Sequence, residues 1–136
     1  MGISRVFFLI GSCAFFLWCA SLVWAQEETI RITEMAVTTK IVKGNPIDSV
    51  RRISSTSVKT LFCFTRIVNP GGDETVVRHV WYKDGQQVSE QELKVTGEKW
   101  RTWSERPINR GSVGDWRVDA IDSGGNLLKS VNFRVN

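Results

Sequence analysis

Beyond residue 25 the chain alternates between apolar and polar positions with a period of two, which indicates β-strands rather than amphipathic helices. The segment 115–122 shows this most clearly, because Trp116, Val118 and Ala120 would lie on one face of a strand. Runs of Gly, Pro, Asn, Asp and Ser, the residues that favour turns, separate the alternating segments. The pattern predicts an all-β chain.

About seven such segments follow one another at the short, regular spacing typical of a β-sandwich or a small barrel. The dipeptide Asp84-Gly85 predicts a tight two-residue hairpin between two of them. The expected strands are 30–37, 58–68, 74–83, 86–95, 99–104, 115–122 and 127–135. Between them we expect a break at 44–46, a loop or a crossing at a sheet edge at 50–57, and a loop at 107–114. The architecture predicted is an immunoglobulin-like antiparallel β-sandwich of about seven strands.

The segment 58–68 is apolar on both of its faces. Phe62, Phe64 and Val68 lie on one face, and Leu61, Cys63 and Ile67 share the other. Two apolar faces predict a central strand whose second face is also covered. The alternative is an exposed apolar patch that binds a partner.

The first 25 residues have a different composition from the rest. Arg5 is their only charged residue, the run from Val6 to Ala25 is uncharged, and Val23-Trp24-Ala25 ends it with a small residue. This order is typical of a secretory signal peptide cleaved after Ala25. Because a run of about 20 apolar residues can also span a bilayer, the alternative is an inner-membrane anchor at residues 6–25. We therefore expect one domain at 26–136, exported to the periplasm or outer envelope, with membrane contact only through an uncleaved leader.

Removing that leader changes what the composition means. Of 136 residues, 111 remain, with one of the three cysteines and a formal charge of +3 in place of +4. A single cysteine, Cys63, cannot form an internal disulfide, so the domain depends on its core. A charge of +3 is too small for the basic stripe of a nucleic-acid-binding protein, and we expect no nucleic-acid partner.

The residues that could carry chemistry do not form a catalytic or metal constellation. His79 is the only histidine, and a zinc site needs several nitrogen or sulfur ligands. Cys63 lies among Phe62 and Phe64, where a buried, inert thiol is expected rather than a nucleophile. His79 is expected to make a structural hydrogen bond, to a carboxylate or near Ser104. We expect no enzyme activity, no metal and no cofactor; a hydrolase is the remaining alternative.

Tryptophan and arginine residues form the one unusual pattern. Trp100 and Trp103 are three residues apart, so they should point to opposite faces of a strand, with one in the core and one outside beside Arg101. Either the outer ring is a stacking platform for a sugar, a peptide or an anionic polymer, or indole and guanidinium planes form a stabilising ladder. The predicted binding face contains Trp103, Arg101, Arg78, Arg117 and His79.

A series of short motifs resembles a known family. These are Asn45-Pro46-Ile47-Asp48, Leu61 to Thr65, His79 to Tyr82 followed by Asp84-Gly85, Trp100 to Ser104, Gly114 to Val118, and then Asp122, Gly125, Leu128 and Phe133. From about Ile41 to Val135 the chain is similar to the bacterial family called domain of unknown function 2914. The resemblance implies an exported or membrane-tethered protein and supplies no activity. We expect a non-catalytic interaction module that binds a protein or envelope component, with a glycan-binding module as the alternative.

Overall fold

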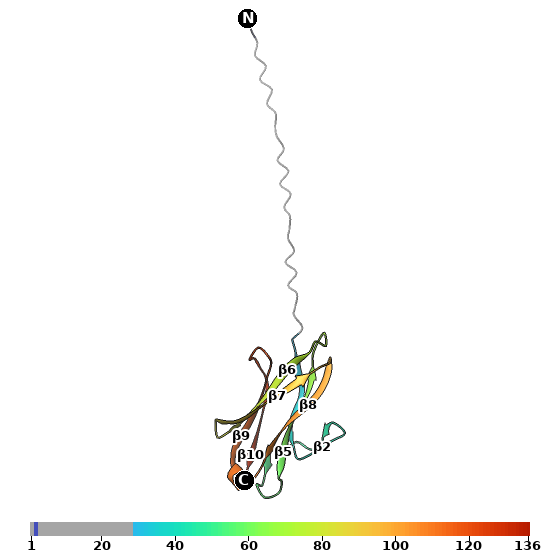
Figure 1. Cartoon of the computed structure of the whole chain (residues 1–136). Helices are drawn as coiled ribbons and strands as arrows, with labels where there is room; N and C mark the ends of the chain where they lie inside the picture. The colour runs from blue at the N-terminus through green and yellow to red at the C-terminus, as the bar shows by residue number, and fades with distance from the viewer. Residues whose placement is uncertain (1, 3–28) are drawn as a thin grey trace.

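The computed structural model describes residue 2 and residues 29–136, so the predicted leader lies outside the described part of the chain except for Gly2 (Figure 1). Seven strands of eight to ten residues correspond to the seven predicted segments. The long strands are β1 (Arg31–Thr38), β5 (Thr60–Val68), β6 (Thr75–Lys83), β7 (Gln86–Val95), β8 (Lys99–Pro107), β9 (Gly114–Ile121) and β10 (Leu127–Val135). The short elements are β2 (Ile41–Val42), β3 (Asn45–Pro46), β4 (Arg52–Ile53) and the 3₁₀ turn η1 (Arg110–Ser112).

The long strands form two facing sheets, with the orders β1-β5-β8 and β4-β10-β9-β6-β7. All pairs are antiparallel except β4, which runs parallel to β10 at the sheet edge. The predicted sandwich is confirmed, with β5 central in its sheet and β7 at an edge. The segment 50–57 contains β4, in agreement with a crossing at a sheet edge.

Strand β8 is longer than the sequence pattern predicted, because it continues past Ser104 to Pro107. It pairs with β5 along the whole length of both strands, from Val68 opposite Lys99 to Thr60 opposite Pro107. The partner strand supplies hydrogen bonds beyond the point where apolar alternation stops. The predicted loop at 107–114 therefore begins later and contains η1.

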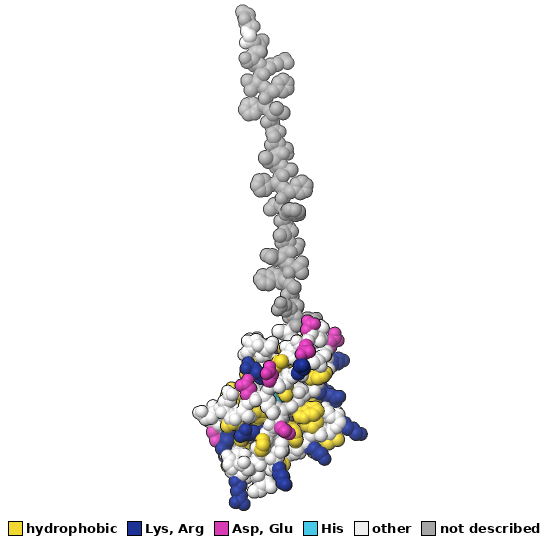
Figure 2. Space-filling view, viewed as in Figure 1, with side chains coloured by type: hydrophobic (Ala, Val, Ile, Leu, Met, Phe, Trp, Pro, Cys, Tyr) yellow, Lys and Arg dark blue, Asp and Glu magenta, His cyan; other side chains and the backbone are white. Residues whose placement is uncertain are grey.

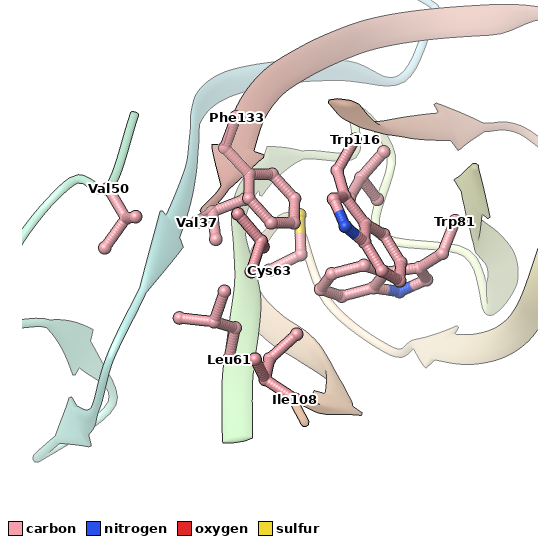
Figure 3. Close-up of a cluster of buried hydrophobic side chains, with 10 residues drawn as sticks. Val37, Val50, Leu61, Cys63, Trp81, Ile108, Trp116 and Phe133 are labelled. Carbon is pink, nitrogen blue, oxygen red and sulfur yellow. The ribbon is translucent and has the colours of Figure 1, made fainter. Parts of the chain in front are cut away.

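The core lies between the two sheets, and three aromatic side chains meet within it (Figure 3). Trp116 and Phe133 are stacked with their ring centres 5.7 Å apart, and Trp81 meets both edge-on. Leu61 and Cys63 face them from β5. A second cluster around Ile67, Val77, Val95 and Ala120 continues the core toward the other end of the sandwich. Trp116, Val118 and Ala120, which were predicted to share one face of 115–122, are all buried.

The second face of β5 is covered only in part, because Phe62 and Val68 on that face are half-buried. Phe64 points away from the core, yet it is fully buried. It lies between Ala36 on β1 and Trp103 on β8, and the guanidinium carbon of Arg66 is 5.5 Å from its ring centre. Within residues 29–136 no helix is long and apolar enough to cross a membrane.

Candidate functional site

The outer face of the three-stranded sheet presents the one strongly exposed tryptophan among the described residues. Trp103 is 39% exposed on β8, whereas Trp100 packs against the second core cluster from the opposite face of the same strand. The predicted division between one inner and one outer indole is confirmed. Arg101 lies on the same outer face as Trp103, two residues earlier on β8.

Two arginines on this face share one acceptor. Arg66 on β5 and Arg101 on β8 lie directly opposite each other in register. Like charges at opposed positions of neighbouring strands destabilise a sheet unless something separates them. Here Oδ1 of Asn45 accepts hydrogen bonds from Nη2 of Arg66 at 3.2 Å and from Nη1 of Arg101 at 3.1 Å. Glu34 balances Arg66 at 3.0 Å, and no carboxylate in the described part of the chain forms a salt bridge with Arg101.

The hairpin β2–β3 brings Asn45 to this position. Lys43 and Gly44 both have positive φ, at 51° and 73°, which turns the chain tightly between the two short strands. A Cβ atom on Gly44 would lie 3.5 Å from the guanidinium carbon of Arg101, so the backbone itself approaches the arginine closely. Because the sheet order is β1-β5-β8, the hairpin after β1 crosses the outer face of β5 to reach β8.

Asp48 anchors the base of the hairpin. Its carboxylate accepts hydrogen bonds from Oγ1 of Thr38 at 2.6 Å and from the amide and hydroxyl of Thr39 at 2.9 and 2.6 Å. Burial acts to raise the pKa of Asp48, but these hydrogen bonds outweigh it and hold the pKa below the ordinary value. The Asp48 carboxylate is therefore fully charged at neutral pH.

We use the term Trp103 face for the outer surface formed by Trp103, Arg101, Arg66 and the hairpin residues 41–48. Val42 and Ile47 of the hairpin are 41% and 56% exposed, so the face carries apolar side chains beside its arginines. Lys and Arg side chains also project along the side of the molecule that carries β8 and β2 (Figures 1 and 2). A groove lined by Gln91, Glu92, Leu93, Trp103 and Glu105 runs between this face and β7.

The other predicted arginines lie elsewhere, so the prediction of one binding face is wrong. Arg78 and Arg117 are on β6 and β9 of the five-stranded sheet, and they point outward on the opposite side of the sandwich. Arg78 pairs with Glu90 at 2.9 Å. Arg117 lies 4.2 Å from the ring centre of Tyr82 and 3.0 Å from the carboxylate of Asp119. The sequence placed them beside Trp103 because period-two alternation does not tell which sheet a strand joins.

His79 is also absent from the Trp103 face, because it is fully buried between the sheets. Its Nδ1 lies 2.7 Å from Oγ of Ser104 and its Nε2 lies 3.2 Å from Oγ1 of Thr65. The expectation of a structural hydrogen bond near Ser104 is confirmed. Burial lowers the pKa of His79 to about 4, so the ring is neutral at physiological pH.

The hydrogen-bond directions in this network follow from chemistry. An indole nitrogen only donates, so Oγ of Ser104 accepts from Nε1 of Trp81 at 3.0 Å. The Ser104 hydroxyl then donates to Nδ1 of His79. Nε2 of His79 carries the ring hydrogen and donates to Oγ1 of Thr65. The Thr65 hydroxyl in turn donates to the carbonyl of Thr102 at 3.1 Å. These hydrogen bonds connect the two sheets, because His79 and Trp81 lie on β6 of the five-stranded sheet whereas Thr65 and Ser104 lie on β5 and β8.

Cys63 is fully buried in the core, where burial raises the pKa of its thiol well above the ordinary value. That is the environment predicted for an inert thiol. No group of three or more His, Cys, Asp or Glu side chains that could hold a metal ion is found among residues 29–136.

Sequence reasoning missed Asn45, Arg66 and Gln91, which helps to line the groove beside Trp103. The strand pattern did place Arg66 on the face of Phe64, so alternation could have identified it. Asn45 was interpreted as part of a chain break and of a family motif, without a contact to any arginine. Its contact with Arg101 spans 56 positions in the sequence, and no local pattern indicates such a contact.

The comparisons with known proteins agree with this fold. The family model described as protein of unknown function (DUF2914) matches residues 74–135. The resemblance is thereby confirmed from β6 to β10, while the motifs upstream of residue 74, and with them the β2–β3 hairpin, lie outside the match. None of the curated proteins matches this chain.

One solved structure shows the same architecture. An immunoglobulin-like protein from Pseudomonas aeruginosa aligns with a TM-score of 0.54 and 13% sequence identity, over 79% of this chain and 97% of that one. An alkylpurine DNA glycosylase of Pseudomonas fluorescens, bound to DNA containing an abasic-site analogue, aligns with a TM-score of 0.49 and 12% identity, over 79% of this chain and 30% of that one. The first likeness confirms the immunoglobulin-like fold.

Proposed function

We propose that this domain is a non-catalytic, exported module of the bacterial cell envelope that binds another protein through the Trp103 face. The observation that carries the proposal is the exposed indole of Trp103 beside Arg101, an arginine without a carboxylate partner among the described residues. Tryptophan and arginine contribute most to binding energy in protein interfaces. The leader-like residues 1–25 and the family resemblance support export.

The residues on the same face as Trp103 favour a protein partner over a glycan. Several coplanar exposed indoles would favour a glycan, but Trp81 and Trp116 are buried and Trp100 packs against the core. The other exposed apolar side chains of the Trp103 face are Val42 and Ile47, which suit an apolar protein surface. A sheet face with an aromatic anchor, arginines and exposed aliphatic residues resembles a protein interface.

Site-specific photocrosslinking in the native bacterium tests this proposal. A photoreactive amino acid at Glu105, next to Trp103 on the outer face, should capture a discrete envelope protein. The same residue placed at Asn132 on the outer face of the five-stranded sheet should not. Capture should be lost in the Trp103→Ala and Arg101→Ala variants.

A matched control comes from the opposite side of the sandwich. Tyr82 and Arg117 form an aromatic–arginine pair there, with the guanidinium carbon 4.2 Å from the ring centre. Tyr82→Ala and Arg117→Ala should leave the capture from Glu105 intact. Equal capture by all variants that keep the wild-type circular dichroism spectrum would rule out the Trp103 face as the binding surface.

A further inference from the structure

A separate group of cations lies at the end of the sandwich where β6 and β8 stop. Lys83, Arg106, Asn109, Gly111, Ser112 and Trp116 line a cavity there of about 240 Å³. None of the lining residues is an Asp or a Glu. The cavity shares no residue with the Trp103 face, so what it binds is independent of the function proposed above.

Arg106 is an unusual residue for its position. It lies opposite Leu61 on the inward face of β8, at the end of the row that contains Ser104. Its guanidinium carbon is 5.7 Å from the ring centre of Trp116, an indole of the core. The Nε of Arg106 is buried, and it has no hydrogen-bond partner among the described residues.

An unsatisfied buried donor is costly, and more so when it belongs to a charged group. Native proteins leave few such groups. The Nε atom itself is closed to solvent, so an acceptor from outside the chain would reach the other nitrogens of the Arg106 guanidinium, and Arg106 lines a cavity without carboxylates.

Lys83 brings a second positive charge to the same cavity. Its Nζ donates to the carbonyl of Gly111 at 2.7 Å, which fixes the ammonium group against η1 and leaves two of its three hydrogens for other acceptors. Neither Lys83 nor Arg106 forms a salt bridge within residues 29–136. Lys83 and Arg106, from two different strands, thus line a cavity whose lining contains no acidic side chain.

We propose that this cavity binds a phosphate group, either free phosphate or a phosphate monoester carried by a larger molecule. An arginine fork and an ammonium group that approach from two strands require acceptor oxygens in several directions. A tetrahedral phosphate presents them, whereas a planar carboxylate presents two oxygens in one plane. Asn109 and Ser112 bond mainly to each other in the cap of η1, so Arg106 and Lys83 carry the recognition.

Titration with inorganic phosphate, followed by ¹H–¹⁵N NMR, tests the site directly. The Nε–H signal of Arg106 should shift and saturate at millimolar phosphate, as should Nε1–H of Trp116, which donates to the carbonyl of Ser112 beside the cavity. Glycerol phosphate in a second titration distinguishes the two sources, because tighter binding of the ester indicates a phosphate on a larger molecule. Acetate should bind at least about tenfold more weakly.

Variants separate a specific site from general attraction to a basic protein. Lys83→Gln should weaken phosphate binding at least about tenfold, and Arg106→Gln should abolish it. Arg117→Gln, which removes an arginine that does not line the cavity, should leave phosphate binding unchanged. The proposal is overturned if wild-type Nε–H of Arg106 does not respond to phosphate, if acetate binds as tightly, or if Lys83→Gln binds like the wild type.

Discussion

The hydroxyl of Ser104 lies 2.7 Å from Nδ1 of His79, and the two residues belong to different sheets. The same oxygen accepts the indole hydrogen of Trp81. One small polar group therefore satisfies two buried rings that would otherwise face an apolar core. Antibody domains join their two sheets by a disulfide. The described part of this chain has a single cysteine, and the hydrogen-bond network connects the two sheets instead.

Replacing Ser104 with Ala should destabilise the domain by about 2–4 kcal/mol. The substitution leaves Nδ1 of His79 and Nε1 of Trp81 without partners, and each unsatisfied buried group costs about 1–3 kcal/mol. Urea unfolding followed by tryptophan fluorescence measures the change. Ser57→Ala, which removes an exposed hydroxyl bonded only to the carbonyl of Ser54, is the control and should be almost neutral. A loss below about 0.5 kcal/mol for Ser104→Ala would contradict the role of the network.

The stability of the domain should fall as the pH drops from about 6.5 to about 4. Burial lowers the pKa of His79 from 6.5 to about 4 in the folded state, so in this range the unfolded chain binds a proton that the folded chain excludes. At about 1.4 kcal/mol per pH unit, the full loss is roughly 3 kcal/mol. Urea unfolding at a series of pH values measures it.

The His79→Gln variant separates this effect from the titration of carboxylates. Glutamine has no charge to gain, so the pH dependence between 6.5 and 4 should largely disappear in the variant. The pKa values of Asp48 and Asp122 are lowered from 3.8, so their contributions are lost only below this range. An unchanged slope in His79→Gln would assign the pH dependence to other groups.

The sequence was sufficient for the sandwich because the relevant signal is local. Alternation and turn residues define each strand, and the inward positions of 115–122 follow from period two alone. The burial of Phe64 on the second face of β5 was also predictable, since Phe64 lies on the opposite side of the strand from Leu61 and Cys63 and the segment is apolar on both faces.

The candidate site was less predictable because it depends on which sheet each strand joins. Arg101 and Arg117 occur on strands of similar pattern, yet one faces the hairpin and the other faces the opposite side of the molecule. The convergence of Arg66 and Arg101 on Asn45 requires the pairing register of β5 with β8 and the position of a hairpin outside both sheets. None of these relationships has a local sequence signature.

Replacing Asn45 with Asp should stabilise the domain by about 0.5–1 kcal/mol at low salt. A carboxylate would then lie between Arg66 and Arg101 in place of a neutral oxygen, and hydrogen bonds between charged groups are stronger. The gain stays small because Arg66 is 41% exposed and water screens the pair. Urea unfolding at about 10 mM and about 1 M NaCl measures it, and salt should remove most of the gain. A gain that persists in high salt would contradict the electrostatic explanation, and Asn45→Ala, which removes the acceptor, should be slightly destabilising.

Gly114 is required at the start of β9, and Gly114→Ala should destabilise the domain by about 1–3 kcal/mol. The residue has a φ of 152°, and a Cβ atom there would lie 2.6 Å from Oδ2 of Asp84. Asp84 cannot move away freely, because its Oδ1 accepts the amide hydrogen of Asp115 at 2.9 Å and its own amide donates to the carbonyl of Asp115 at 2.7 Å. The added methyl group would therefore break the contact that holds the β6–β7 turn against β9.

Two further variants identify the cause of the expected loss at Gly114. Gly97→Ala places a Cβ atom 3.6 Å from the Trp100 ring, an ordinary contact, and should change the free energy of unfolding by much less. Asp84→Ala removes the carboxylate that the new methyl group would meet, so Gly114→Ala should cost less in that background than in the wild type. Thermal unfolding of the four proteins and of the double variant measures this coupling. Equal costs of Gly114→Ala in the two backgrounds would show that backbone strain alone, without the contact to Asp84, requires glycine at this position.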